Sequence, residues 1–365
     1  MNKLKKGILI LLLSLLIIGG LVWYEFLGKR AQLPVFAKDI SNSSPISILA
    51  KGLDIPWALD FLPDNKIIFT ERAGEIKLID ISENNKVLKI ATLPDVSAVS
   101  EAGLLGVAVH PNFEKNHFIY LYYTYNKRGD YLNKVVRFEL LNLKIVNPKI
   151  IIDGIPGASI HDGGRLRFGP DGYLYITTGD ANKAYLAQDL NSLAGKILRI
   201  TDKGGIPNDN PFAGSPVYSY GHRNPQGIAW DNQHQLWATE HGPSKHDEIN
   251  LIKPGQNYGW PIIKGKEKKE GMESPFLESG DETWAPSGAD IHNDILYFGG
   301  LRGRTLYSFN LKTKELKEYF NSQFGRLREV KFSKKGSLYL TTSNRDGRGL
   351  PENDDDMILI IKGLK

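Results

Sequence analysis

The strongest constraint on the fold is a pattern that occurs six times along the 365 residues of the chain. Each copy has a polar turn with Asp, Asn or Gly, then a run of bulky residues typical of a strand, then a polar or glycine-rich loop. Successive copies are about 40 to 60 residues apart, which is the length of a four-stranded propeller blade. The six strand segments are Lys66–Arg72, Phe118–Tyr122, Tyr173–Thr177, Gln235–Thr239, Ile295–Phe298 and Ser337–Thr341.

These repeats predict an all-β, six-bladed β-propeller over residues 47–365. A single blade cannot bury both of its faces, so neighbouring blades must stack in a ring. An open β-sandwich is the alternative, but six copies in register argue against it. The chain after the N-terminal segment has no long apolar period of 3.6 residues, so few helices are expected.

The N-terminal segment has a different character. Three lysines precede an almost wholly apolar run over residues 7–27. About 20 apolar residues can cross a bilayer as one helix, and the lysines favour a cytoplasmic N-terminus. We therefore predict an uncleaved transmembrane helix over residues 1–30, a linker over 31–46 and a propeller on the periplasmic, extracytoplasmic face. A cleaved signal peptide is the alternative.

Charge and cysteine content exclude several classes of protein. The net charge is +5, and most of the excess lies within residues 1–30. The remainder is close to neutral, which argues against nucleic-acid binding because that function needs a concentrated basic face. The chain has no cysteine, so it has no disulfide, no thiolate metal site and no lipoprotein anchor.

A glycine-rich loop before the third copy contains the first candidate for catalysis. His161 lies in the segment Ile160–Arg165, and Asp180 follows one hairpin later in Thr178-Gly179-Asp180. A histidine whose tautomer is fixed by a carboxylate is an arrangement suited to a general base. A loop histidine that is merely exposed is the alternative.

Several arginines lie at turns that do not need them for packing. Arg223 and Asn224 are adjacent, and their side chains suit an anionic or carbonyl oxygen. Arg326 and Arg328 are two residues apart and point the same way in an extended segment. With Arg302, they form a candidate clamp for a polycarboxylate. Structural or surface roles for these side chains are the alternative.

The loop over residues 240–250 contains carboxylates and turn residues with accessible backbone carbonyls. Hard cations such as Ca²⁺ bind oxygen ligands of both kinds. His241, His246 and Asp247 also raise the possibility of zinc, but their spacing fits no standard zinc motif. A solvated acidic turn is the remaining alternative.

Together these motifs resemble the soluble quinoprotein sugar dehydrogenases, the glucose/sorbosone or aldose sugar dehydrogenase family that uses pyrroloquinoline quinone (PQQ). The resemblance extends from about Gly52 to the C-terminus. It implies a six-bladed propeller that oxidises the C1 hydroxyl of aldoses to lactones by hydride transfer to PQQ, with Ca²⁺ and an external electron acceptor. The segments that carry it are Glu101–Gly106 with His110-Pro111, His161–Arg165, Gly195–Arg199, Gly221–Gly227, Asp247–Asn250 and Asn257–Pro261.

The resemblance also assigns a role to individual residues. His161 matches the base, Asp180 matches the carboxylate that orients it, and Arg223 matches the cation that polarises the quinone carbonyl together with Ca²⁺. The backbone carbonyls that match the ligands of this Ca²⁺ belong to Gly242 and Pro243. The cofactor contacts match Glu101, Asn224, Thr283, Arg302, Arg326 and Arg328. A second, structural Ca²⁺ matches Glu248 and the carbonyl of Tyr258.

Three positions depart from the best-studied members of that family, which have Gln at Glu101, Lys at Arg302 and Gln at His241. Arg302 keeps the positive charge, whereas Glu101 adds a negative charge near an anionic cofactor. The long insertions that help glucose-specific members to dimerise are absent, which favours a compact monomer or weak dimer with broad aldose specificity. The alternatives are a calcium-dependent propeller lactonase or esterase and a non-catalytic propeller that binds sugars or partners.

Overall fold

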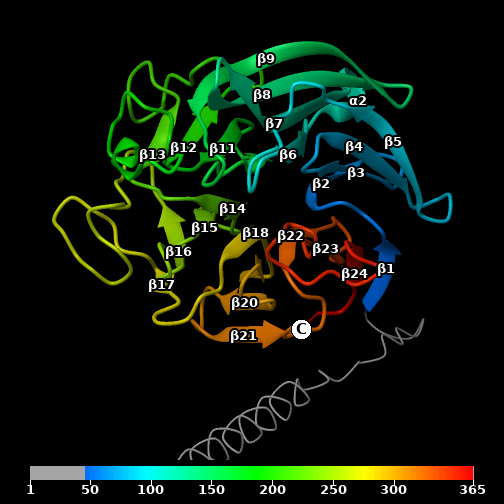
Figure 1. The fold of residues 1–365 in the computed structure, drawn as a ribbon. Helices are drawn as coiled ribbons and strands as arrows, with labels where there is room; N and C mark the ends of the chain where they lie inside the picture. Colours follow the sequence, from blue (N-terminus) through cyan, green and yellow to red (C-terminus); the bar gives the residue numbers. More distant parts are fainter. Residues whose placement is uncertain (1–45, 365) are drawn as a thin grey trace, which may run out of the picture. The chain divides into compact units, whose positions relative to one another are not determined.

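The computed structural model describes residues 46–364, which form six four-stranded antiparallel sheets. The sheets follow one another around a ring in chain order, each as one blade of a β-propeller (Figure 1). The predicted six-bladed fold is therefore confirmed.

The blades have the following strands. The first contains β2 (Pro56–Leu62), β3 (Lys66–Glu71), β4 (Glu75–Asp80) and β5 (Lys86–Thr92). The second contains β6 (Leu104–Val109), β7 (Phe118–Lys127), β8 (Asp130–Leu141) and β9 (Lys144–Pro156). The third contains β10 (Leu166–Phe168), β11 (Leu174–Thr178), β12 (Lys196–Ile200) and β13 (Val217–Tyr220). The fourth contains β14 (Pro225–Trp230), β15 (Leu236–Glu240), β16 (Glu248–Ile252) and β17 (Leu277–Glu278). The fifth contains β18 (Pro286–His292), β19 (Ile295–Gly300), β20 (Leu306–Asn310) and β21 (Leu316–Tyr319). The sixth contains β22 (Leu327–Phe332), β23 (Leu338–Thr342), β24 (Ile358–Ile361) and β1 (Ile46–Ala50).

The sixth blade closes the ring with strands from both ends of the propeller. The first strand, β1, pairs antiparallel with the last strand, β24, and Ile46 lies opposite Ile361. Figure 1 shows these two strands side by side, one blue and one red. Closure of this kind protects the sheet edges that an open ring would expose.

Each of the six repeated segments forms the second strand of a blade, namely β3, β7, β11, β15, β19 and β23. These strands lie inside their sheets and are packed on both faces, so every residue of β11 and of β23 is buried. Strands buried on both faces read as continuous apolar runs in a sequence. This burial explains why the second strands gave the clearest pattern.

The core of the propeller lies between neighbouring blades. In β3, Ile67 and Phe69 pack in one cluster with Ile358 of the sixth blade. The intervening residue, Ile68, packs in another cluster with Leu104 of the second blade. Side chains alternate between the two faces of a strand, so one strand contributes to two interfaces. Each large apolar side chain buried in this way contributes roughly 1.5–3 kcal/mol of stability.

A buried ion pair crosses the central channel. Arg165, just before β10, pairs with Glu329 of β22, and each side chain is only 1% exposed. Nε of Arg165 donates to the carbonyl of Gln226 at 2.8 Å, and its guanidinium lies 4.4 Å from the centre of the Trp57 ring. Trp57 and Gln226 also line the large cavity described below, so this pair supports the floor of that cavity.

Helices are few, as expected. Between residues 46 and 364 the helices are α2 (Phe113–Asn116) and the 3₁₀ helix η1 (Ala184–Ala187). Within that range, neither is long and apolar enough to cross a membrane. The predicted anchor over residues 1–30 and the linker up to residue 45 lie outside the described residues, so both stay predictions.

Candidate active site

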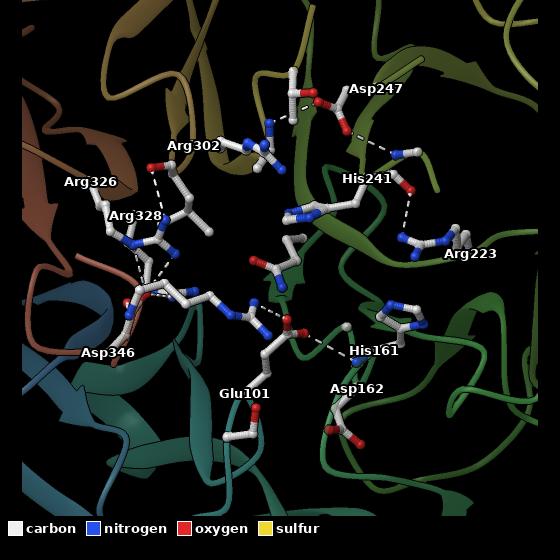
Figure 2. Close-up of a pocket in the computed structure, with 18 of the residues that line it drawn as sticks. Glu101, His161, Asp162, Arg223, His241, Asp247, Arg302, Arg326, Arg328 and Asp346 are labelled. Carbon is white, nitrogen blue, oxygen red and sulfur yellow. Dashed lines mark hydrogen bonds and ion pairs between the residues drawn. The ribbon is translucent and has the colours of Figure 1, made fainter. Parts of the chain in front are cut away.

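A cavity of about 450 Å³ lies at one end of the central channel. Its walls come from all six blades, because alternate loops of an antiparallel blade emerge on the same side of the ring. The loops that precede the first strands of five successive blades supply Glu101, His161, Arg223, Thr283 and Arg326. Figure 2 shows how side chains from these loops converge.

Most of the residues predicted for the site line this cavity, but four do not. Asp180 and Asn224 lie behind its wall, and Glu248 and Tyr258 border a second, smaller cavity. The predicted residues that line the main cavity are Glu101, His161, Arg223, Gly242, Pro243, Thr283, Arg302, Arg326 and Arg328.

His161 and Asp180 form the predicted dyad. Nδ1 of His161 donates to Oδ1 of Asp180 at 2.8 Å, which leaves Nε2 as the acceptor of the ring. The side chain of His161 is 12% exposed, and that of Asp180 is 2% exposed. Gly179 permits this contact, because a Cβ at that position would lie 1.8 Å from the carbonyl oxygen of His161. Any side chain at position 179 would therefore clash with the backbone of His161.

Glu101 is held between two partners. Its Oε2 accepts from the backbone N–H of His161 at 3.2 Å, and its Oε1 forms an ion pair with Arg348. Burial raises the pKa of Glu101, but the hydrogen bond and the charge of Arg348 outweigh burial and lower the pKa below its usual value. The negative charge of Glu101 at the cavity is therefore paired with the guanidinium of Arg348.

Arg326 and Arg328 point the same way, as predicted from their spacing, and one carboxylate holds both. Oδ2 of Asp346 accepts from Nη2 of Arg326 at 2.8 Å and from Nη2 of Arg328 at 3.3 Å. Both arginines are less than 8% exposed. Burial raises the pKa of Asp346, but the charges of Arg328 and Arg326 outweigh burial and lower it. The three residues form a fixed charged cluster on one wall of the cavity.

A buried relay positions Arg223. The ring of His222 bridges the hydroxyl of Ser219 and the carboxylate of Glu240, with both distances 2.8 Å. The other oxygen of Glu240 accepts from the backbone N–H of Arg223. Ser219 and His222 are both 0% exposed, so no substrate reaches this Ser-His-Glu arrangement. Its role is structural, and it fixes the backbone from which the Arg223 guanidinium extends.

The loop after β15 is fixed by Asp247. Its two carboxylate oxygens accept from the backbone N–H groups of Gly242, Trp284 and Ala285 at 2.7–2.9 Å. His241 lies on this loop, and burial lowers the pKa of its ring to about 3. His241 is therefore neutral near physiological pH.

The zinc alternative finds no support in this loop. His246 is in the same loop as His241, but its Nδ1 pairs with Oε2 of Glu278 on β17 at 2.7 Å. Within residues 46–364 no group of three or more His, Asp or Glu side chains has the arrangement of metal ligands. A cation at this loop would depend on backbone carbonyls and on oxygen atoms of a bound cofactor.

The second cavity lies behind the same loop. Glu248 and Tyr258 border it together with Gly242, Pro243 and Glu240. Burial and the nearby Glu240 carboxylate raise the pKa of Glu248 to about 8. Two buried carboxylates beside each other are a feature that a bound cation stabilises.

Asn224 does not line the main cavity. Its Oδ1 accepts from the backbone N–H of Gly163 at 3.0 Å, so the side chain links the loops of the third and fourth blades. Its Nδ2 is buried and has no hydrogen-bond partner within the described part of the chain. The predicted contact of Asn224 with a cofactor stays a prediction.

The sequence profile of the family described as Glucose / Sorbosone dehydrogenase matches residues 53–358. The chain belongs to this family. The family predicted from the motifs is therefore confirmed.

Two relatives in the glucose/sorbosone dehydrogenase family cover most of the chain. The aldose sugar dehydrogenase YliI of Escherichia coli (strain K12) is 34% identical, and the match covers 83% of this chain and 91% of YliI. The PQQ-bound aldose sugar dehydrogenase (Adh) of Streptomyces coelicolor is 39% identical, with a TM-score of 0.81, and the match covers 86% of this chain and 97% of that one.

Asp346 and Arg348 also line the cavity of this dehydrogenase, although none of the sequence motifs includes them. A signal for them exists in the sequence. The loop after the third repeat begins with Gly179-Asp180, the loop after the fourth contains His241, and the loop after the sixth contains Asp346 and Arg348. Loops that follow the second strand of each blade therefore all open toward the same face.

Asp162 allows a prediction about the pH dependence of stability. Its Oδ1 accepts from Nδ2 of Asn133 and from the backbone N–H of Ala158 at 2.9 and 3.0 Å, whereas Oδ2 has no partner within residues 46–364. Burial raises the pKa of Asp162 from 3.8 to about 7. The folded protein therefore keeps a proton that the unfolded chain releases, and this stabilisation is lost as the pH rises from about 4 to 7.

We expect Asp162→Asn to remove this dependence. The free energy of unfolding of the wild type should fall by roughly 3 kcal/mol more than that of the variant between pH 4 and pH 7. Urea titrations at several pH values measure the difference, and the exposed Asp130→Asn is the control. Equal slopes for the wild type and Asp162→Asn would show that folding does not raise the pKa of Asp162.

Proposed function

We propose that this protein oxidises the C1 hydroxyl of aldose sugars to lactones, with PQQ and Ca²⁺ as cofactors. The observation that carries the proposal is the His161–Asp180 dyad at a cavity with a surplus of arginines. Six arginines line the cavity against four carboxylates. The family and the PQQ-bound relative support the same chemistry.

The lining of the cavity fits PQQ, which is flat and has three carboxylates. Arg326 and Arg328 lie on one wall, and Arg302 is exposed at the cavity. Nε of Arg223 and Nε2 of His241 are buried and have no hydrogen-bond partner within residues 46–364. An oxygen-rich anion would satisfy these groups, whose burial without a partner otherwise costs free energy.

The loop after β15 fits Ca²⁺ through its backbone. Asp247 holds Gly242, and a Cβ on that glycine would lie 2.0 Å from the carbonyl of Lys245. The turn is therefore too tight for a side chain at this position. Gly242 and Pro243 would hold Ca²⁺ through their carbonyl oxygens, and the ion would act as a Lewis acid on the cofactor. Glu248 and the Tyr258 carbonyl would hold the second, structural Ca²⁺.

The mechanism follows from the residues around the cavity. PQQ, when bound, supplies the quinone carbon that accepts the hydride from C1. Nε2 of His161 takes the proton of the C1 hydroxyl, and Asp180 holds the proton on Nδ1 so that Nε2 remains free to act as a base. Arg223 places a positive charge where negative charge develops on the quinone oxygen.

The two alternatives from the sequence gain less support. A lactonase needs no clamp for a tricarboxylate, yet Arg223, Arg326 and Arg328 all line the cavity that contains His161. A non-catalytic propeller needs no histidine oriented by a carboxylate. The pair of Glu101 and Arg348 also removes the main objection to PQQ, because the carboxylate is balanced by a guanidinium.

The cellular setting in this proposal follows from the sequence. The N-terminal segment would hold the propeller at the periplasmic face of the membrane, where an external acceptor takes the electrons. We propose a monomer or weak dimer.

Reconstitution tests this function. The propeller without its N-terminal segment is loaded with PQQ and Ca²⁺, and reduction of an artificial dye is followed over a panel of aldoses. We expect dye reduction that requires PQQ, Ca²⁺ and sugar together. Failure of every sugar with fully loaded protein would contradict the proposal, and hydrolysis of lactones without PQQ would favour the lactonase.

Arg302 gives a separate prediction for cofactor affinity. Because a cation at this position pairs with a PQQ carboxylate, we expect Arg302→Met to raise the Kd for PQQ roughly tenfold. Arg302→Lys should stay much closer to the wild type, because it keeps the charge. Arg304→Met is the matched control, since Arg304 is exposed on the same loop but does not line the cavity. Absorbance titration with PQQ measures all three, and equal losses in Met and Lys variants would show that charge is not the cause.

A further inference from the structure

We propose that Trp260 is a positioning residue that sets the proton affinity of His161 through Asp180. The indole Nε1–H of Trp260 donates to Oδ2 of Asp180 at 2.8 Å. The other carboxylate oxygen, Oδ1, contacts Nδ1 of His161. Trp260 thus acts on the base from the far side of the carboxylate. The inference rests on the proposed function of His161 as a base.

The carboxylate of Asp180 is shared among three donors. Oδ1 accepts from the backbone N–H of Asn182 at 2.8 Å in addition to His161. The donor to the other carboxylate oxygen of Asp180, Oδ2, is the Nε1–H of Trp260. Asp180 is only 2% exposed, so water does not replace a lost donor easily. Each donor therefore takes a share of the negative charge that stabilises a protonated His161.

Trp260 is itself held in place at both ends of its backbone. Its N–H donates to the carbonyl of Gly221 at 2.9 Å, and its carbonyl accepts from Nε2 of Gln188 at 2.7 Å. The guanidinium of Arg223 lies 5.4 Å from the centre of its ring. One indole consequently contacts the two groups that the mechanism uses, the dyad through its N–H and the guanidinium through its ring face.

Other charged groups near His161 do not change in the test. Those that contact His161 or line the same cavity are Asp180, Glu101, Asp162, Arg223, His241 and, through Glu101, Arg348. The substitution Trp260→Phe removes the N–H and keeps an aromatic ring, so it changes one hydrogen bond to Asp180 and leaves these charges in place.

The expected shift has a definite sign. Without the indole donor, more of the carboxylate charge acts on the imidazole, so protonated His161 is favoured. We expect the midpoint of the His161 NMR titration in the PQQ-free protein to rise by roughly one pH unit in Trp260→Phe. The acid limb of the kcat/KM profile of the loaded enzyme should move in the same direction. The NMR titration needs no cofactor, so it stands even where the proposed sugar oxidation fails.

The chain contains a matched control. Nε1 of Trp237 donates to Oδ2 of Asp231 at 2.9 Å, and neither residue lines the cavity. Trp237→Phe loses the same kind of hydrogen bond and should leave the titration of His161 unchanged. A midpoint that stays the same or falls in Trp260→Phe would overturn the proposal, as would an equal rise in Trp237→Phe.

A measurement on the wild type covers the case in which Trp260→Phe does not fold. The Nε1–H resonance of Trp260 should titrate with the same midpoint as the ring of His161, because the two groups share one carboxylate. The Nε1–H resonance of Trp237 should not follow that midpoint. A Trp260 resonance that is insensitive to the titration of His161 would overturn the proposal without any variant.

Discussion

Replacement of His161 by alanine should lower kcat by about 10²- to 10⁴-fold, because a positioned general base contributes that much to proton transfer. The affinity for PQQ should change little, since the cations that suit its carboxylates lie on other loops. His161 donates to the buried Asp180 and has no contact with the arginine cluster in this dyad, so truncation removes the base without disturbing that cluster. Steady-state kinetics at saturating sugar and absorbance titration with PQQ measure the two effects separately.

His292→Ala is the control for this substitution. The ring of His292 stacks on Phe332 with centres 4.6 Å apart and does not line the cavity, so kcat should be close to that of the wild type. A loss of PQQ binding in His161→Ala would mean that His161 mainly holds the cofactor. Undiminished turnover would mean that another group takes the proton.

Replacement of Arg165 by methionine should destabilise the folded protein by up to about 3–5 kcal/mol, because it removes the more buried of the two guanidinium groups that pair with the buried Glu329 carboxylate. The remaining donors to Glu329 are Arg167 at 3.2 Å and the backbone N–H groups of Leu59 and Val330. The pair spans the channel and supports Trp57, so we also expect weaker PQQ binding. Thermal and chemical unfolding measure the change in stability.

The double variant Arg165→Met/Glu329→Gln tests the cause. It removes both charges and keeps an acceptor for the donors around Glu329, so it should recover part of the lost stability. Lys51→Met is the control for an exposed pair, since Lys51 and Asp354 are 59% and 54% exposed, and it should have little effect. If Arg165→Met unfolds no more readily than Lys51→Met, the channel pair is not a determinant of stability.

The sequence revealed the fold through the strands that are buried on both faces. The second strand of each blade shows a continuous apolar run, as in β11 and β23, and six such runs at blade spacing leave few alternatives. The pairing of β1 with β24 was not visible, because ring closure joins two ends of the propeller that are distant in sequence and have no shared motif. Long-range contacts of this kind are set by the whole ring.

The sequence predicts those parts of the site whose residues are close together in the chain. Arg326 and Arg328 were assigned to one face from their spacing alone, and His161 and Asp180 are separated by a single hairpin. The sequence does not predict the residues that neutralise these charges. Asp346 pairs with Arg326 and Arg328, and Arg348 pairs with Glu101, which is 247 positions away in the chain. The resemblance matches both Arg223 and Asn224 to cofactor contacts, and in the structure Oδ1 of Asn224 accepts from the backbone N–H of Gly163. Adjacent residues in a loop point in different directions, so proximity in sequence did not settle its role.

An anaerobic single-turnover measurement tests sugar oxidation in this cavity most directly. Protein loaded with PQQ and Ca²⁺ is mixed with an aldose that is unlabelled or deuterated at C1, and the quinone absorbance is followed without an external acceptor. We predict a stoichiometric absorbance change, one equivalent of lactone and a slower change with the deuterated sugar, because the C1 hydride is transferred. An unchanged spectrum with bound PQQ would contradict the assignment of His161, Arg223 and the arginine cluster to aldose oxidation.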